Sequence, residues 1–255
     1  MKNKLLSVIN LGDAYEIQAR VFPSLLAVLP VTLLATALEL EQGRWLTALG
    51  LGSGLEVVLA VALSKIAHAL GRDLESTLVK AWGGLPTVRW LLPADKSHSE
   101  QQKSQWRTAL SQASGLDLSA ALLGEGDEYA RVASDAVLSV RNKIRGDKRS
   151  NLLLKQNVGY GFARNVAGLR WVIVVLSVGA FSAAVVGYWH HRVHASVIMI
   201  EALFVTISLG FAWIATRYVG HCAYRYAENF FTTVMAIVKA PVKPKQTKAA
   251  ASAAK

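Results

Sequence analysis

The sequence predicts an all-α polytopic membrane protein, with four transmembrane helices in two hairpins and a helical cytoplasmic module inserted between them. Its 255 residues are 53% hydrophobic, yet the formal net charge is +11. Soluble domains seldom combine these values, so the apolar residues must be concentrated in segments. Windows of about 18 nearly uncharged residues, enough to cross about 30 Å of hydrocarbon, occur four times.

The first and third windows, residues 21–38 and 171–189, contain no charged residue. The second, residues 45–64, is interrupted only by Glu56, and the fourth, residues 195–216, only by Glu201. Polar sequence precedes the first window, which is longer than the apolar part of a signal peptide. We therefore expect a retained helix there.

Orientation follows from the basic residues. The two short turns between the paired windows hold one arginine each, Arg44 and Arg192, so almost all of the 28 lysine and arginine residues lie elsewhere. Loops rich in these residues stay in the cytoplasm during insertion. We expect a bacterial inner-membrane protein with the lipid bilayer as a partner and with both termini and residues 67–168 cytoplasmic.

Four regions follow: residues 1–66 with the first hairpin, residues 67–168 as the module, residues 169–238 with the second hairpin and a cytoplasmic helix extension, and residues 239–255 as a tail. The tail is basic and has little to bury, so we expect disorder.

Helices are predicted throughout the module. Residues 68–82 continue the second membrane helix as far as a turn at Trp82, Gly83, Gly84 and Pro86. The spacing of Ser97 and Glu100 matches a capping box before a helix that ends near residue 114. Apolar residues at helical spacing predict another helix over residues 127–144.

Glu56 and Glu201 are the sharpest chemical signals. An ionisable group in a membrane helix costs about 2.5 to 3.5 kcal/mol on insertion scales and is usually retained for a reason. Two hypotheses carry equal weight. The carboxyls can line an ion pathway, or they can be protonated or hydrogen-bonded groups that join helices.

The basic run at residues 141–149 is expected to contact phosphate or anionic lipid, and the lipid interpretation is favoured. No aromatic side chain is interleaved for base stacking, so nucleic acid is not expected, whereas a nucleotide or cytoplasmic protein stays open as a ligand of the module. The residues concerned are Arg141, Lys143, Arg145, Lys148 and Arg149.

The stretch NVGYGFARN, residues 157–165, leads into the third membrane window. Tyr160, Gly161, Phe162 and Arg164 can form a hinge that couples the module to that helix. They can instead anchor the helix at the lipid headgroups, and the sequence slightly favours this interpretation.

Enzyme signatures are absent from the sequence, including G-x-S-x-G, the phosphate loop, H-E-x-x-H and paired metal-binding cysteines. We expect no catalysis, no cofactor and no metal. The single cysteine, Cys222, excludes an internal disulfide, and the turn HHRVH, residues 190–194, is expected to face solvent.

Four short motifs are distributed over most of the chain: AYEIQAR at 14–20, WGGLPT at 82–87, DEYARVASDAV at 127–137 and NVGYGFARN at 157–165. In order and spacing the chain resembles a family of uncharacterised bacterial inner-membrane proteins that carry YExxAR, WGGxPT and NxxYGFxRN. Ala163 and Leu91-Leu92-Pro93 depart from that pattern, which has arginines there. The resemblance implies a fold and a location more than an activity.

We therefore expect a non-enzymatic homo-oligomer whose cytoplasmic module senses a ligand and alters a channel or the bilayer. Membrane proteins of this plan are, by analogy only, common effectors in antiphage defence. Two alternatives stay open: a membrane-anchored scaffold that presents its module to a soluble partner, and a small transporter.

Overall fold

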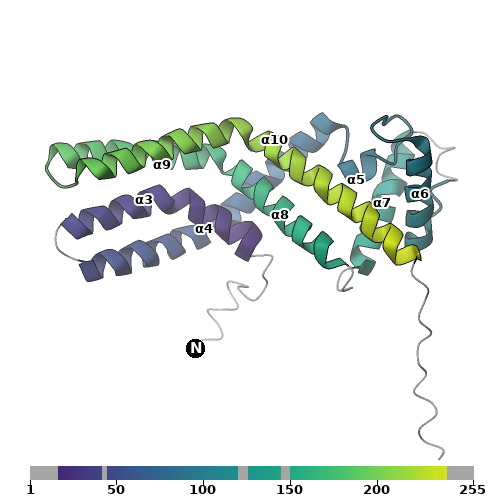
Figure 1. Cartoon of the computed structure of the whole chain (residues 1–255), viewed down its shortest axis with the longest axis horizontal. Coiled ribbons are helices and arrows are strands. Elements are labelled where there is room, and N and C mark those ends of the chain that lie inside the picture. Colours follow the sequence, from purple (N-terminus) through teal and green to yellow (C-terminus); the bar gives the residue numbers. More distant parts are fainter. Residues whose placement is uncertain (1–16, 42–44, 120–125, 145–149, 240–255) are drawn as a thin grey trace, which may run out of the picture. The chain divides into compact units, whose positions relative to one another are not determined.

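The computed structural model describes residues 17–41, 45–119, 126–144 and 150–239 (Figure 1). Within these ranges all regular structure is helical, which confirms the all-α class. The order is η1 Ile17–Val21, α3 Phe22–Glu41, α4 Trp45–Trp82, α5 Pro86–Arg89, α6 Glu100–Ser114, α7 Gly126–Ile144, α8 Asn151–Gly168, α9 Arg170–Trp189 and α10 Ala195–Lys239.

The chain forms two compact units that differ from the predicted regions. One unit takes residues up to 86 and residues 152–227, and the other takes residues 87–151 and those from 228 onward. The second half of α4 and nearly all of α8, both predicted as parts of the module, thus belong with the apolar helices. Helix α10 continues without a break from the first unit into the second, so secondary structure does not mark that boundary.

Three helices of the first unit are long and apolar enough to cross a membrane: residues 17–40, α9 and α10. The segment at residues 45–64, predicted as a fourth crossing, forms the first half of α4. In Figure 1, α3 lies alongside α4, and α9 alongside the first half of α10. Large apolar side chains point away from the protein, with Val175, Met199 and Trp213 exposed by 68%, 72% and 75%. Surfaces of this kind need lipid or another protein to cover them.

Small residues let these helices approach closely. Ala180 and Ala184 of α9 pack with Leu34 of α3, and Val197 and Ile198 of α10 pack against the same cluster.

The predicted stop of α4 is confirmed. Gly83 and Gly84 have φ of 70° and 124°, values that favour glycine, and their N–H groups bond carbonyls in the last turns of α4. Pro86 then occupies the first position of α5, where a missing N–H costs nothing. Trp82 packs on the cluster that contains Ala215 and Val219 of the same unit.

The second unit has an aromatic core. Trp106 stacks on Phe231 at a centroid distance of 4.3 Å, and Trp90 lies 4.4 Å from the ring of His98. The predicted capping box is two residues out of place, because Ser99 and not Ser97 caps α6. Ser97 instead donates its backbone and side-chain hydrogens to Asp95, so the chain turns before the helix begins.

Two buried cations hold the backbone of the second unit at α6. Lys103 Nζ donates to the Leu92 carbonyl at 3.0 Å and to Glu100 at 2.6 Å. Arg107 donates twice to the Leu91 carbonyl, at 3.0 and 2.8 Å, and the hydroxyl of Tyr129 donates to the same oxygen. These bonds satisfy backbone carbonyls that follow α5 and lie outside any helix.

Candidate functional site

Helices α4 and α8 cross in backbone contact at two glycines of the first unit. A Cβ added to Gly168 would lie 2.5 Å from the backbone nitrogen of Gly71, and one added to Gly71 would lie 2.4 Å from Oδ1 of Asn165. Gly168 requires glycine for space because its added Cβ would meet backbone atoms, whereas at Gly71 the Asn165 side chain would have to move. The close approach brings polar side chains of the two helices within bonding range.

Glu75 of α4 is the acceptor at the centre of this crossing. The hydroxyl of Tyr160 donates to its Oε1 at 2.7 Å, and Nη1 of Arg164 donates to its Oε2 at 2.8 Å. Tyr160 and Arg164 are one turn apart on α8 and therefore share a face. The Arg164 side chain is 10% exposed and that of Glu75 is 22% exposed, so the ion pair is largely screened from water.

The remaining donors of Arg164 extend the network. Its Nη2 lies 3.4 Å from Nδ1 of His68, and because a guanidinium can only donate, this contact uses an unprotonated Nδ1. Its Nε donates to Oδ1 of Asn165 at 3.3 Å. We call Glu75, Tyr160, Arg164, Asn165 and His68 the crossing cluster.

Asn165 links the crossing cluster to the start of α3. Its Nδ2 donates to the carbonyl of Ala19 at 2.6 Å. Ala19 belongs to the π-helical segment η1, which precedes Pro23 of α3. The asparagine amide supplies a donor to this carbonyl from α8, which leads through Leu169 into α9.

Electrostatics favour the ion pair and a neutral phenol. Burial, together with the adjacent charge of Glu75, raises the pKa of Tyr160 far above its ordinary value. The tyrosine is therefore a fixed hydrogen-bond donor. The donors around this one carboxylate join α8 to α4 and, through Asn165, to the start of α3.

Sequence reasoning found half of this site. Tyr160 and Arg164 were singled out, but they point into the protein instead of toward headgroups, and Gly161 beside them is buried. Phe162 is half-buried, and Gly159 has open space around it. Glu75, His68 and Gly71 were missed. Their spacing of three and four residues places them on one face of α4, but only the fold shows that this face meets residues 160, 164 and 168 of α8.

The two membrane carboxyls differ in burial. Glu201 is completely buried, and neither of its oxygens has a hydrogen-bond partner among the residues that the structure describes. Glu56 is half-buried on α4. Glu201 is thus the group whose placement calls for an explanation, since a buried polar group without a partner costs free energy.

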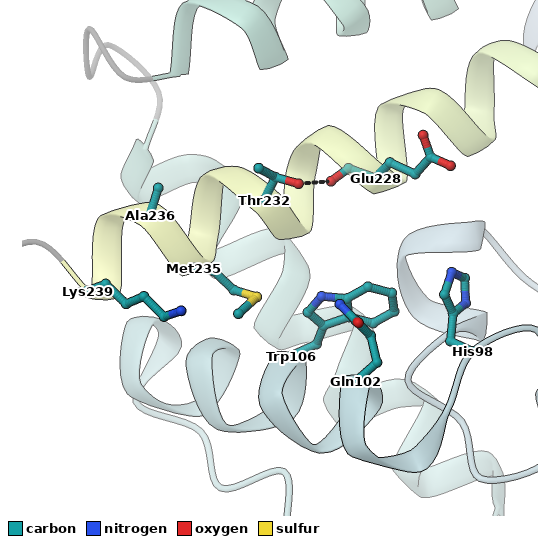
Figure 2. Close-up of a pocket in the computed structure, with 8 residues that line it drawn as sticks. All are labelled: His98, Gln102, Trp106, Glu228, Thr232, Met235, Ala236 and Lys239. Atoms are coloured by element: carbon teal, nitrogen blue, oxygen red, sulfur yellow. Dashed lines mark hydrogen bonds between the residues drawn. The ribbon is translucent and has the colours of Figure 1, made fainter.

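A groove of about 500 Å³ lies in the second unit, between α6 and the end of α10 (Figure 2). Trp106 and Met235 form its apolar part, and Glu228 and Lys239 bring opposite charges. Trp106 is only 6% exposed, so its ring face is not free to stack on a ligand. The other lining residues are His98, Gln102, Thr232 and Ala236.

Two of the five predicted phosphate- or lipid-contacting residues, Arg141 and Lys143, lie within the described ranges. Lys143 caps the end of α6 by donating to the carbonyls of Ala113 and Ser114, and Arg141 is exposed on α7. Arg145, Lys148 and Arg149 lie outside the described residues, as does the tail from 240 onward. Within the described ranges, no cluster of three or more His, Cys, Asp or Glu residues could hold a metal.

Comparison of the chain with protein-family models, with curated proteins and with solved structures finds no match in any of the three.

Proposed function

We propose that the chain is a homo-oligomeric inner-membrane protein that forms a pore, and that its cytoplasmic helices gate this pore through the crossing cluster. The observation that carries the proposal is Glu201. A carboxyl that faces the protein interior within an apolar helix has the placement of a pathway group, because acidic groups inside membrane bundles mark ion and proton routes.

The apolar segments of α9 and α10 have the same length, as expected if both cross one membrane, and this supports the topology. Trp171 at one end of α9 and Trp189 at the other are separated by about 27 Å at 1.5 Å per residue, and so are residues 195 and 213 of α10. Trp171 and Trp213 are exposed, and Arg170 and Arg217 lie 5.9 and 5.4 Å from the centres of their rings. Such aromatic and basic pairs are typical of the inner interface, where arginine contacts phosphates.

The same thickness accommodates four crossings. Residues 22–40 of α3 and residues 45–64 of α4 match the length of α9, and Arg20 and Lys65 would then lie at the cytoplasmic boundary. The positive-inside rule assigns both termini to the cytoplasm. The crossing cluster would lie just beyond the membrane on that side, at the base of α3, α4 and α9.

Gating through the cluster follows from its connections. It joins the helix before α9, the extension of α4 and the carbonyl of Ala19 before α3. A shift of α8 would therefore break or remake bonds to all three. Helix shifts of this kind are a recurrent means of converting a binding event into opening. The use of such a pore as an effector in antiphage defence remains an analogy.

The test is ion flux through the full chain reconstituted in liposomes. Glu201→Gln and Glu56→Gln remove the charge and keep the shape of the side chain, whereas Glu128→Gln removes an exposed charge on α7 and serves as the matched control. We expect flux in the wild type and the control, and its loss in at least one membrane variant. Equal flux in all four proteins would exclude the pathway role.

The groove of the second unit favours a second candidate, a membrane-anchored scaffold. Its opposite charges at Glu228 and Lys239 flank apolar Met235, a combination that suits a protein partner. Replacing the apolar segments with an unrelated anchor should then preserve function, whereas a pore would be abolished.

A further inference from the structure

Glu201 lies on the inward face of α10. Ser208 and Ala215 follow it at intervals of seven residues, and all three side chains are buried. One turn before it, Val197 and Ile198 pack against the cluster formed by α3 and α9. Protein atoms alone cover the carboxyl, so lipid is not required to exclude water from it.

Among the residues that the structure describes, no hydrogen-bond donor reaches either oxygen of Glu201. In the sequence, α9 has no charged residue after Arg170, and the basic residues nearest along the chain are His194, just before α10, and Arg217, about two and four turns away. Helix α3 carries Glu39 and Glu41, the apolar half of α4 carries Glu56, and neither helix has a basic residue before Lys65. An ionised carboxylate here would be unpaired, at a cost of several kcal/mol.

We infer that Glu201 is a proton-binding site, occupied in the packed state of the bundle, and that loss of its proton forces α10 to separate from α3 and α9. A neutral carboxyl fits the dry interior, whereas an anion has to be hydrated. The site itself is inferred from burial, and only its consequence for opening rests on the proposed pore.

A proton fits the surroundings better than a metal ion does. Hard cations need about six oxygen ligands, and a single carboxyl cannot supply them. The nearest hydroxyl on the same face, that of Ser208, already donates to the carbonyl of Val205, and the helix carbonyls are engaged in helical hydrogen bonds. Glu201 lies roughly 9 Å from the end of α10 nearest the turn at 190–194, so the proton would exchange with that side.

The test uses dicyclohexylcarbodiimide, an apolar reagent that attacks neutral carboxyls. The acid adds across one C=N bond: its oxygen bonds to the central carbon and its proton moves to nitrogen, so the adduct gains the whole reagent and nothing leaves. The experiment uses the full chain in liposomes at about pH 7.5, where ordinary carboxyls are ionised. We expect peptide mapping to find the adduct on wild-type Glu201 and to lose it in Glu201→Gln, while Glu128→Gln is labelled like the wild type.

A second measurement does not depend on access of the reagent. Because the packed state holds the proton more tightly than the unfolded state, the wild-type melting temperature should fall as pH rises from about 5 to about 9, and this fall should be smaller in Glu201→Gln. An adduct confined to Glu56 or Glu39, or parallel pH profiles for the two proteins, would overturn the inference.

These outcomes are separable from those of the flux experiment. If Glu201 is labelled and no ion flux is measured, the proton site stands and the pore is excluded. If flux is lost in Glu201→Gln and wild-type Glu201 is not labelled, the ion pathway stands and the proton site is excluded.

Discussion

Arg164 and Glu75 lie 89 residues apart in the sequence, and their side chains meet at 2.8 Å in a largely buried ion pair. Tyr160 occupies the other oxygen of Glu75, so both carboxylate oxygens are engaged. If either residue moved away, the other would keep a largely buried charge without this counter-charge. The pair therefore favours one position of α8 on α4.

Glu75→Gln should lower the free energy of unfolding by about 3 kcal/mol, because it leaves the Arg164 guanidinium buried without its counter-charge. Melting of the full chain in detergent measures the loss. Asp73→Asn, on the exposed face of the same helix, is the control and should change little. In an Arg164→Met background, Glu75→Gln should cost much less, and additive effects of the two changes would contradict the pairing.

Gly168→Ala should destabilise the α4–α8 crossing by about 3 kcal/mol or more, since the new methyl group would meet backbone atoms that cannot move aside. Gly159→Ala on the same helix meets open space and should stabilise α8 by about 0.5 to 1 kcal/mol. Comparison of the two melting temperatures checks both effects. Equal changes would mean that the helices do not cross at Gly168.

The Gly159 variant also tests the hinge hypothesis. If flexibility at residues 159–161 transmits movement, Gly159→Ala should reduce ion flux in liposomes while it raises the melting temperature. Unchanged flux would assign the coupling to the crossing cluster alone.

Sequence patterns predicted the helical class and several helix ends because these depend on local chemistry. The stop at Gly83 and Gly84 and the helix at 127–144, observed from Gly126 to Ile144, rest on backbone conformation and apolar spacing within a few turns. The cap of α6 was misplaced because Ser97 and Ser99 are equally good caps locally. Asp95 decides between them by engaging Ser97.

The crossing cluster could not be predicted because its parts are distant in the sequence. Nothing near Glu75 indicates that Tyr160 and Arg164 will reach it, and nothing near Asn165 indicates that its amide will bond the Ala19 carbonyl. Pairing of this kind depends on which faces of two helices meet. The unit boundary at residue 227 was unpredictable for a similar reason, since α10 passes through it as an unbroken helix.

Acid should weaken the second unit through Asp95. Burial opposes ionisation of this carboxyl, but hydrogen bonds from Ser97 and the charge of Arg89 outweigh it, so its pKa lies below the ordinary value. The stabilisation is present above the unfolded pKa of about 4 and is lost as pH falls through the folded value. Near-ultraviolet circular dichroism of the full chain should show an acid transition that is shallower in Asp95→Asn. Identical acid profiles would contradict this role.

Lys103→Met should destabilise the second unit by about 2 kcal/mol. The apolar stem is kept, but the carbonyl of Leu92 and the carboxylate of Glu100 lose their buried donor. Gln101→Met, exposed on the same helix, is the matched control and should be neutral. The melting temperature distinguishes them, and a stabilised Lys103→Met would mean that desolvation of the ammonium outweighs its bonds.

The proposed topology places the turn at residues 190–194 outside and α6 inside, and one cysteine makes this easy to test. Cys222→Ser removes the only thiol, after which Arg192→Cys and Ser104→Cys each introduce one at an exposed position. A membrane-impermeant maleimide should label residue 192 in intact cells and residue 104 only after the membrane is opened. The reverse pattern would invert the orientation. Labelling of both in intact cells would deny that the apolar part of α10 separates two compartments, and with it the membrane crossing on which the pore depends.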